Sequence, residues 1–162
     1  MSKQSSTKSK ELKIITRHVV TINDVLKDPR KIRILYLINE FEEISEKALQ
    51  YLVYWLKSEK NIDLGYDFLV IGNVPSSKDL KMDLVALLYV GALEANPKNK
   101  KLRVTGIGKE LLGKVDLDKE ELDKIVANAK EYEAKVKSID AEVELTVKML
   151  SSARRRRRRR FI

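Results

Sequence analysis

Apolar residues near the start of the chain recur at helical spacing behind residues that favour helix starts. Thr21 and Asp24 form a weak capping box, which predicts one short turn of helix. Asp28 as an N-cap and Pro29 in the first helical position predict a firmer helix with a wide apolar stripe. Ser45 caps a further helix that we expect to continue to about residue 59. The first part of the folded region is therefore predicted to be helical.

A short β-prone run and a third main helix follow. Residues 66–72 hold consecutive apolar side chains bounded by glycines, which predicts a strand. Ser76 and Asp79 have capping-box spacing and predict the start of a helix that ends at Gly91. The apolar face of this helix consists of Leu80, Leu84, Leu87 and Leu88.

Turn-forming residues then separate two short segments. Pro97 and the flanking asparagines favour a turn over residues 96–99, between strands at 92–94 and 101–104. Thr105 caps a short helix after the second strand. This region is therefore predicted to be a β-hairpin followed by a helix.

From Asp118 onward the pattern changes to a heptad repeat. Asp118 and Glu121 form a capping box, and no Gly or Pro interrupts residues 118–152. We expect one helix of about 50 Å at about 1.5 Å per residue. Because a compact domain of this size cannot bury so long a stripe, we expect it to pair with a second copy; folding back onto its own domain is the alternative. The expected dimer seam comprises Leu122, Ile125, Ala129, Tyr132, Val136, Ile139, Val143, Val147 and Leu150.

The net charge is concentrated in seven consecutive arginines. The whole chain carries +9, from 33 Lys+Arg and 24 Asp+Glu, and without the seven the balance is 26 against 24, or +2. Like charges repel, so we expect residues 153–162 to form a disordered tail until a polyanion binds them. Arginine forks onto phosphate oxygens, which favours nucleic acid. The alternatives are a solubilising or artefactual terminus and contact with an anionic membrane surface.

Composition removes several function classes. The chain has no cysteine, which excludes disulfides, thiolate zinc sites and cysteine nucleophiles. No apolar run approaches the roughly 18 residues of a membrane span, and residues 1–13 lack the apolar segment of a secretory signal. We therefore expect a cytoplasmic, nucleoid-associated protein. The only histidine, His18, lies in an expected basic flexible arm over residues 1–20, and no catalytic or metal-binding motif is present, so we expect no enzyme activity and no cofactor.

Short motifs lie at the joints between the predicted elements. The first main helix opens with Leu26, Asp28-Pro29 and Ile34-Leu35. The third helix and the following strand hold Leu84, Leu87, Gly91 and Leu93. The exit from the hairpin holds Val104-Thr105-Gly106, Gly108, Leu111 and Leu112. These motifs resemble those of the winged helix-turn-helix superfamily of DNA-binding proteins over about residues 25–115. The middle of the chain is also similar to a group of uncharacterised archaeal winged-helix regulators, through Tyr66-Asp67-Phe68, Gly72, Pro75, Ser76, Leu80, Asp83 and Leu84.

The resemblance implies a mainly α fold with a small β wing, of the α+β class. A winged helix-turn-helix would occupy residues 21–115, a long coiled-coil-like helix residues 116–152 and the arginine tail residues 153–162. In that fold the third helix enters the major groove of DNA. Its candidate contacts are Ser76, Ser77, Lys78 and Lys81, although Asp79 and Asp83 balance their charge.

The wing and the tail supply further candidate contacts. The wing lysines and arginine suit a phosphate backbone or a minor groove, and an ordinary solvated turn is the alternative. The wing candidates are Lys98, Lys100, Lys101 and Arg103. The tail candidates are Arg154, Arg155, Arg156, Arg157, Arg158, Arg159 and Arg160.

We therefore expect a dimeric winged-helix protein that binds double-stranded DNA, as a transcription regulator or an architectural protein. Its arginine tail would add nonspecific phosphate contacts. The alternative is a module for protein or RNA interaction, antitoxin-like or associated with a polymerase or ribosome, whose tail binds RNA. The fold itself does not decide between them, because winged helices serve both purposes.

Overall fold

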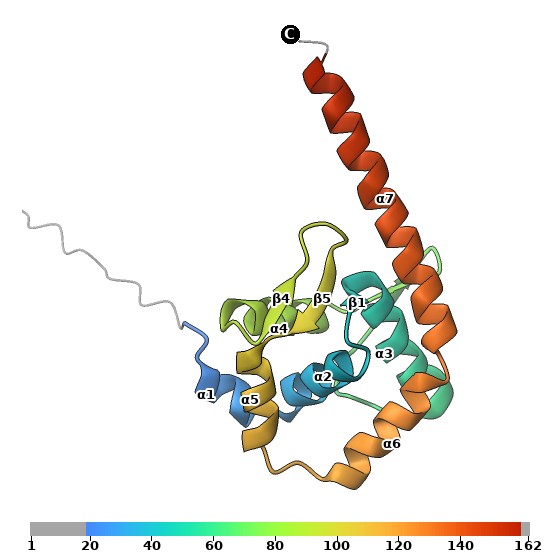
Figure 1. Ribbon diagram of the computed structural model, residues 1–162. Coiled ribbons are helices and arrows are strands. Elements are labelled where there is room, and N and C mark those ends of the chain that lie inside the picture. The colour runs from blue at the N-terminus through green and yellow to red at the C-terminus, as the bar shows by residue number, and fades with distance from the viewer. Residues whose placement is uncertain (1–18, 160–162) are drawn as a thin grey trace, which may run out of the picture.

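The computed structural model describes residues 19–159 and has a helical body with two small antiparallel sheets and a projecting C-terminal helix (Figure 1). This confirms the mainly α, α+β class expected from the sequence. The elements in chain order are α1 (Ile22–Lys27), α2 (Pro29–Glu40), β1 (Ile44–Ser45), α3 (Glu46–Lys60), β2 (Leu69–Ile71), β3 (Val74–Ser76), α4 (Lys78–Tyr89), β4 (Leu93–Ala95), β5 (Lys101–Val104), α5 (Gly106–Lys114), α6 (Lys119–Lys130) and α7 (Glu133–Arg159).

The larger sheet has the strand order β1-β5-β4, with Ile44 opposite Leu102 and Leu93 opposite Val104. The β4–β5 hairpin was predicted, but β1 was not, because two residues are too few to show an alternating pattern. The strand expected at residues 66–72 is β2. It pairs with β3 in a separate hairpin that protrudes between α3 and α4.

Local capping signals locate most helix starts correctly. Thr21 and Asp24 form a complete capping box on α1, and Asp28 caps α2 ahead of Pro29. Ser45 caps α3 through a hydrogen bond donated by the Ala48 backbone N–H. The prediction for α4 was wrong by one residue, as described below. These caps matter because a side-chain oxygen satisfies an N–H group that the helix itself leaves unpaired.

Helix α2 lies in the hydrophobic core, and the wide apolar stripe predicted for it is buried there. The side chains of this stripe are fully or almost fully buried, and α4, α5, α6 and β5 pack against α2. The α2 residues concerned are Ile32, Ile34, Leu35, Leu37 and Ile38.

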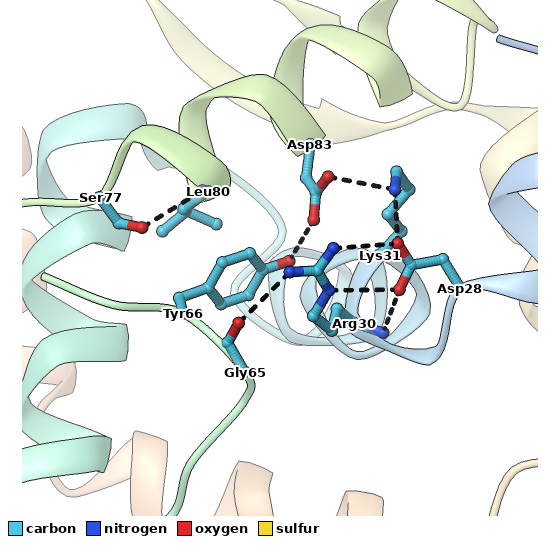
Figure 2. Close-up of polar contacts among 8 residues, drawn as sticks. All are labelled: Asp28, Arg30, Lys31, Gly65, Tyr66, Ser77, Leu80 and Asp83. Carbon is cyan, nitrogen blue, oxygen red and sulfur yellow. Dashed lines mark hydrogen bonds and ion pairs between the residues drawn. The ribbon is translucent and has the colours of Figure 1, made fainter.

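A polar network joins the start of α2 to α4 across this core (Figure 2). Asp83 points inward from α4, where its carboxylate lies 3.1 Å from Lys31 and accepts a 2.8 Å hydrogen bond from the Tyr66 hydroxyl. Lys31 also contacts Asp28 at 2.6 Å. Burial opposes the charge of Asp28, but hydrogen bonds from Lys31 and Arg30 outweigh it and hold its pKa below the ordinary value. Burial, reinforced by the Asp83 carboxylate, raises the pKa of Tyr66.

The single helix expected over residues 118–152 is interrupted. A turn at residues 131 and 132 divides it into α6 and α7, and both pack on the body. The first five residues of the predicted dimer seam are buried within their own chain, and Ile139 is partly buried. The seam from Leu122 to Val136 is therefore not available to a second copy, and the alternative of folding back is correct for this half.

The C-terminal part of α7 projects from the body, and the helix continues through Arg159 (Figure 1). The expectation of a disordered segment from residue 153 is therefore wrong over residues 153–159. Arginine is a good helix former, and cations near a helix C-terminus are favoured by the helix dipole. Within residues 19–159 no helix is both long enough and apolar enough to cross a membrane.

Candidate nucleic-acid interface

The outward face of α4 carries the two lysines that the sequence analysis selected, but its centre is apolar. Lys78 and Lys81 are exposed and make no ion pair with any described residue. Met82, Val85 and Tyr89 lie beside them with exposed fractions of 60%, 65% and 66%. Asp83, which the sequence analysis counted against DNA binding, faces the core instead, so it does not contribute to the outer charge of α4.

One of the two serines before α4 is buried and cannot take the role predicted for it. Ser77, not Ser76, is the N-cap of α4, and its hydroxyl accepts a hydrogen bond from the Leu80 backbone N–H (Figure 2). Ser77 is only 1% exposed, and its own N–H donates to Gln50 Oε1 at 2.9 Å. Ser76 belongs to β3 and is half-buried. A contact between Ser77 and a nucleic acid is therefore excluded in this conformation.

The four basic residues of the wing divide into two pairs. Lys101 donates to Glu144 of α7 at 2.8 Å, which raises the lysine pKa. Arg103 pairs with Glu94 on the neighbouring strand. Lys98 and Lys100 are exposed in the β4–β5 turn and make no ion pair with any residue of the described range. Only the turn lysines are therefore available to an external anion without breaking an existing pair.

The turn of the wing and the arginine end of α7 form one cleft. Figure 1 shows both extending from the same side of the body. The cleft has a volume of about 650 Å³. Val147 and Leu150 supply an apolar part of its lining, here called the floor, and Lys100 and the arginines supply a cationic part. It is lined by Pro97, Lys100, Val147, Leu150, Ser151, Arg154, Arg155, Arg157 and Arg158. Two residues assigned to the dimer seam, Val147 and Leu150, thus face the wing of their own chain.

Two of the three remaining arginines, Arg156 and Arg159, belong to the described part of α7. Arg156 is exposed but does not line the cleft, and Arg159 is the last residue of α7. Arg160 lies outside the described residues, as do the first 18 residues of the expected arm. Four of the seven predicted arginine contacts are therefore brought together with one wing lysine.

Polar and aromatic contacts hold α7 in the position that forms the cleft. The Ser45 backbone N–H donates to Asp140 at 2.9 Å in a buried contact, which attaches α7 to the end of β1. At the start of α7 the ring of Tyr132 stacks on Trp55 with centroids 5.3 Å apart. The Tyr132 hydroxyl donates to Glu59, and burial together with this hydrogen bond raises the tyrosine pKa to about 12.

Comparison of the chain with protein-family models, with curated proteins and with solved structures gives no match. In the described range no group of three or more His, Cys, Asp or Glu side chains could hold a metal ion. The floor of the cleft was not anticipated from the sequence. Its signal was the apolar spacing of Val147 and Leu150, which the sequence analysis assigned to a dimer seam.

Proposed function

We propose that this chain is a winged helix-turn-helix protein that binds the phosphate backbone of double-stranded DNA through the cleft between the β4–β5 turn and the end of α7. The observation that carries the proposal is the convergence of Lys100 and four arginines on one cleft. Arginine guanidinium groups bind phosphate oxygens through paired hydrogen bonds, and their charge cannot be removed by deprotonation.

The topology of the body supports the assignment to the winged-helix superfamily. The successive helices α3 and α4, followed by the β4–β5 hairpin that pairs with β1 in the order β1-β5-β4, are consistent with a helix-turn-helix followed by a wing. The close packing of the motif glycine in α5 is also consistent with it. A Cβ atom on Gly108 would lie 2.3 Å from the carbonyl oxygen of Ala92. The β2–β3 hairpin between α3 and α4 is then an insertion into the helix-turn-helix.

The chemistry of the cleft favours contact with phosphates over reading of bases. Phosphate contacts supply affinity without sequence information, whereas specificity needs side chains that reach base edges. The face of α4 that would enter the major groove offers Lys78 and Lys81 around an apolar centre. We therefore propose a nonspecific, architectural mode of DNA binding, in the cytoplasm and on the nucleoid, in preference to promoter reading.

The proposal is tested by replacing Arg154, Arg155, Arg157 and Arg158 together with glutamine and measuring duplex binding across a salt series. Each phosphate contact contributes about −0.9 to the slope of log K against log salt. Removal of four contacts should therefore make the slope shallower by up to about 3.6. The corresponding arginine-to-lysine variant keeps the charge and is expected to keep most of the slope.

A matched control removes four positive charges from α5 and α6, at Lys109, Lys114, Lys119 and Lys124, all of which are exposed. This control is expected to leave the slope nearly unchanged, because these residues do not line the cleft. If the arginine-to-glutamine variant and this control lose the same amount of salt slope, only net charge matters, and a defined site is refuted. Stronger binding of structured RNA than of duplex DNA would support the RNA-binding alternative.

A further inference from the structure

The outer face of α4 is an apolar groove without a described occupant. Val19 and Val20 form one wall, α4 forms the other, and the open volume is about 650 Å³. Met82, Val85 and Tyr89 lie side by side here and are 60–66% exposed, and clustered exposed apolar side chains are candidate sites of association. The groove is lined by Val19, Val20, Lys78, Lys81, Met82, Val85, Ala86 and Tyr89.

We propose that this groove is a homodimer interface in which α4 packs antiparallel against α4 of a second copy. The argument is the self-complementarity of the helix face. A two-fold axis through the midpoint of Lys78–Tyr89 sets Lys78 of one copy beside Tyr89 of the other. The same axis sets Lys81 beside Ala86 and Met82 beside Val85. A two-fold interface requires such pairing, because the same surface must serve both copies.

The paired residues are chemically compatible. Met82 and Val85 form an apolar centre, and Ala86, the smallest side chain in the groove, leaves room for the aliphatic stem of Lys81. At each end the Lys78 ammonium group lies near an aromatic ring and near the C-terminal carbonyl groups of the other helix. Both environments favour a cation, through the ring quadrupole and the helix dipole.

Charge favours antiparallel over parallel packing of the two copies. Parallel packing would bring the lysines of both helices together at one end, where like charges repel. Antiparallel packing separates them to opposite ends of the interface. It also uses a surface that shares no lining residue with the arginine cleft, so each dimer would keep two such clefts. The sequence analysis expected a homodimer through the heptad seam, whereas the proposed interface lies on α4. This inference does not depend on DNA binding.

Cysteine cross-linking of the full chain tests the register, because the natural sequence contains no cysteine. In the proposed packing two copies of residue 85 lie about 4.5 Å apart along the helix axis, whereas two copies of residue 89 lie about 16 Å apart. Under mild oxidation Val85→Cys is therefore expected to form a covalent dimer. Tyr89→Cys, on the same exposed face, is the matched control and is expected to form no covalent dimer under the same oxidation.

Sedimentation of the full chain gives a second readout that does not need cross-linking. Val85→Asp is expected to convert the dimer to monomer, with an unchanged circular dichroism spectrum because residue 85 is exposed. Met149→Asp, which changes an exposed apolar residue on α7, is expected to remain a dimer.

Two results would overturn the proposal. A dimer that survives Val85→Asp but is lost in Met149→Asp would assign association to α7. A monomeric wild-type chain would refute self-association. In that case, slow reaction of Val85→Cys with maleimide would mean that residues 1–18 cover the groove. Rapid reaction would mean that the groove is exposed to solvent.

Discussion

Side chains on α4 and at the arginine end of α7 were both predicted to contact nucleic acid, yet the surfaces that they form differ in kind. The α4 face has two lysines around Met82, Val85 and Tyr89. The α7 cleft has one lysine and four arginines around a small apolar floor. Position in the fold therefore does not determine the role of a helix, because the side chains that remain exposed after packing decide what it can bind.

The two helices are also attached to the body in different ways. The inner side of α4 holds Asp83 in a buried network with Lys31 and Tyr66. By contrast, α7 is attached at its N-terminal half by Asp140 and by pairs on its surface, and its arginine end projects. Substitutions on the inner side of α4 should thus change stability, whereas those on the distal part of α7 should change binding alone.

The largest expected effect separates stability from binding on α4. Asp83→Ala removes a partner of both Lys31 and Tyr66. Breaking a fully buried pair costs about 3–5 kcal/mol, and since Lys31 retains Asp28 we expect a loss of about 3 kcal/mol in the free energy of unfolding. Urea denaturation measures it. Asp79→Ala, at an exposed position in the first turn of the same helix, is the control and should cost only about 0.3–1 kcal/mol, through the helix dipole. Weaker duplex binding by folded Asp83→Ala would contradict the separation.

Charge reversal compares the two surfaces directly as DNA contacts. Replacing Lys98 and Lys100 with glutamate should weaken duplex binding about 50-fold at 0.1 M salt, from the loss of two phosphate contacts. The same change at Lys78 and Lys81 should have little effect. Binding is measured on a duplex short enough for one chain, so that a change in dimerisation does not alter it. A larger loss of duplex affinity from charge reversal at Lys78 and Lys81 would instead support insertion of α4 into the major groove.

The sequence was most informative where structure is decided locally. Asp28, Ser45 and Thr105 cap the helices that they were predicted to cap, because a cap involves only residues two or three positions away. The spacing of Asp83 from Leu80 and Leu87 already puts it on the apolar side of α4, but its partners Lys31 and Tyr66 could not be predicted, because they lie far away in the chain. The burial of the first half of the heptad seam depends likewise on α3, since one apolar spacing suits either a second copy or the chain's own body.

The cleft at the end of α7 shows the same limit for function. The arginines and the wing lysines were each selected from the sequence for their charge. Their convergence depends on contacts such as Lys101 with Glu144, whose partners are separated by 43 positions in the printed sequence. No local signal specifies such a contact, so the sequence identified the groups but not the site that they form.

A smaller effect tests how firmly α7 is held in position. Asp140→Ala leaves the buried Ser45 N–H without its acceptor, which should cost about 1–2 kcal/mol in the free energy of unfolding. The matched control is Glu142→Ala, which removes only the exposed pair with Lys47 and should cost about 0.5 kcal/mol or less. Denaturation of both variants measures the difference. Equal losses would mean that the buried contact contributes no more than the exposed one.

The smallest expected effect is a pH dependence of the attachment of α7. The hydrogen bond from Lys101 lowers the pKa of Glu144, and the same bond raises the pKa of Lys101. A lowered carboxyl pKa stabilises the folded state above the ordinary value of 4.5, and this contribution is lost as the pH falls through the lowered pKa. A raised lysine pKa stabilises below 10.5, and its contribution is lost as the pH rises through the raised pKa.

The attachment should accordingly be strongest between these limits, and the only tryptophan of the chain can report it. Trp55 stacks on Tyr132 at the start of α7, so loosening of α7 should change its fluorescence. A small transition is expected below pH 4.5 in the wild-type protein and is expected to be absent in Glu144→Gln. If both proteins show the same acid transition, another carboxyl group controls α7. The position of the arginine cleft would then depend on contacts other than the wing pair, such as the buried hydrogen bond between the Ser45 N–H of β1 and Asp140.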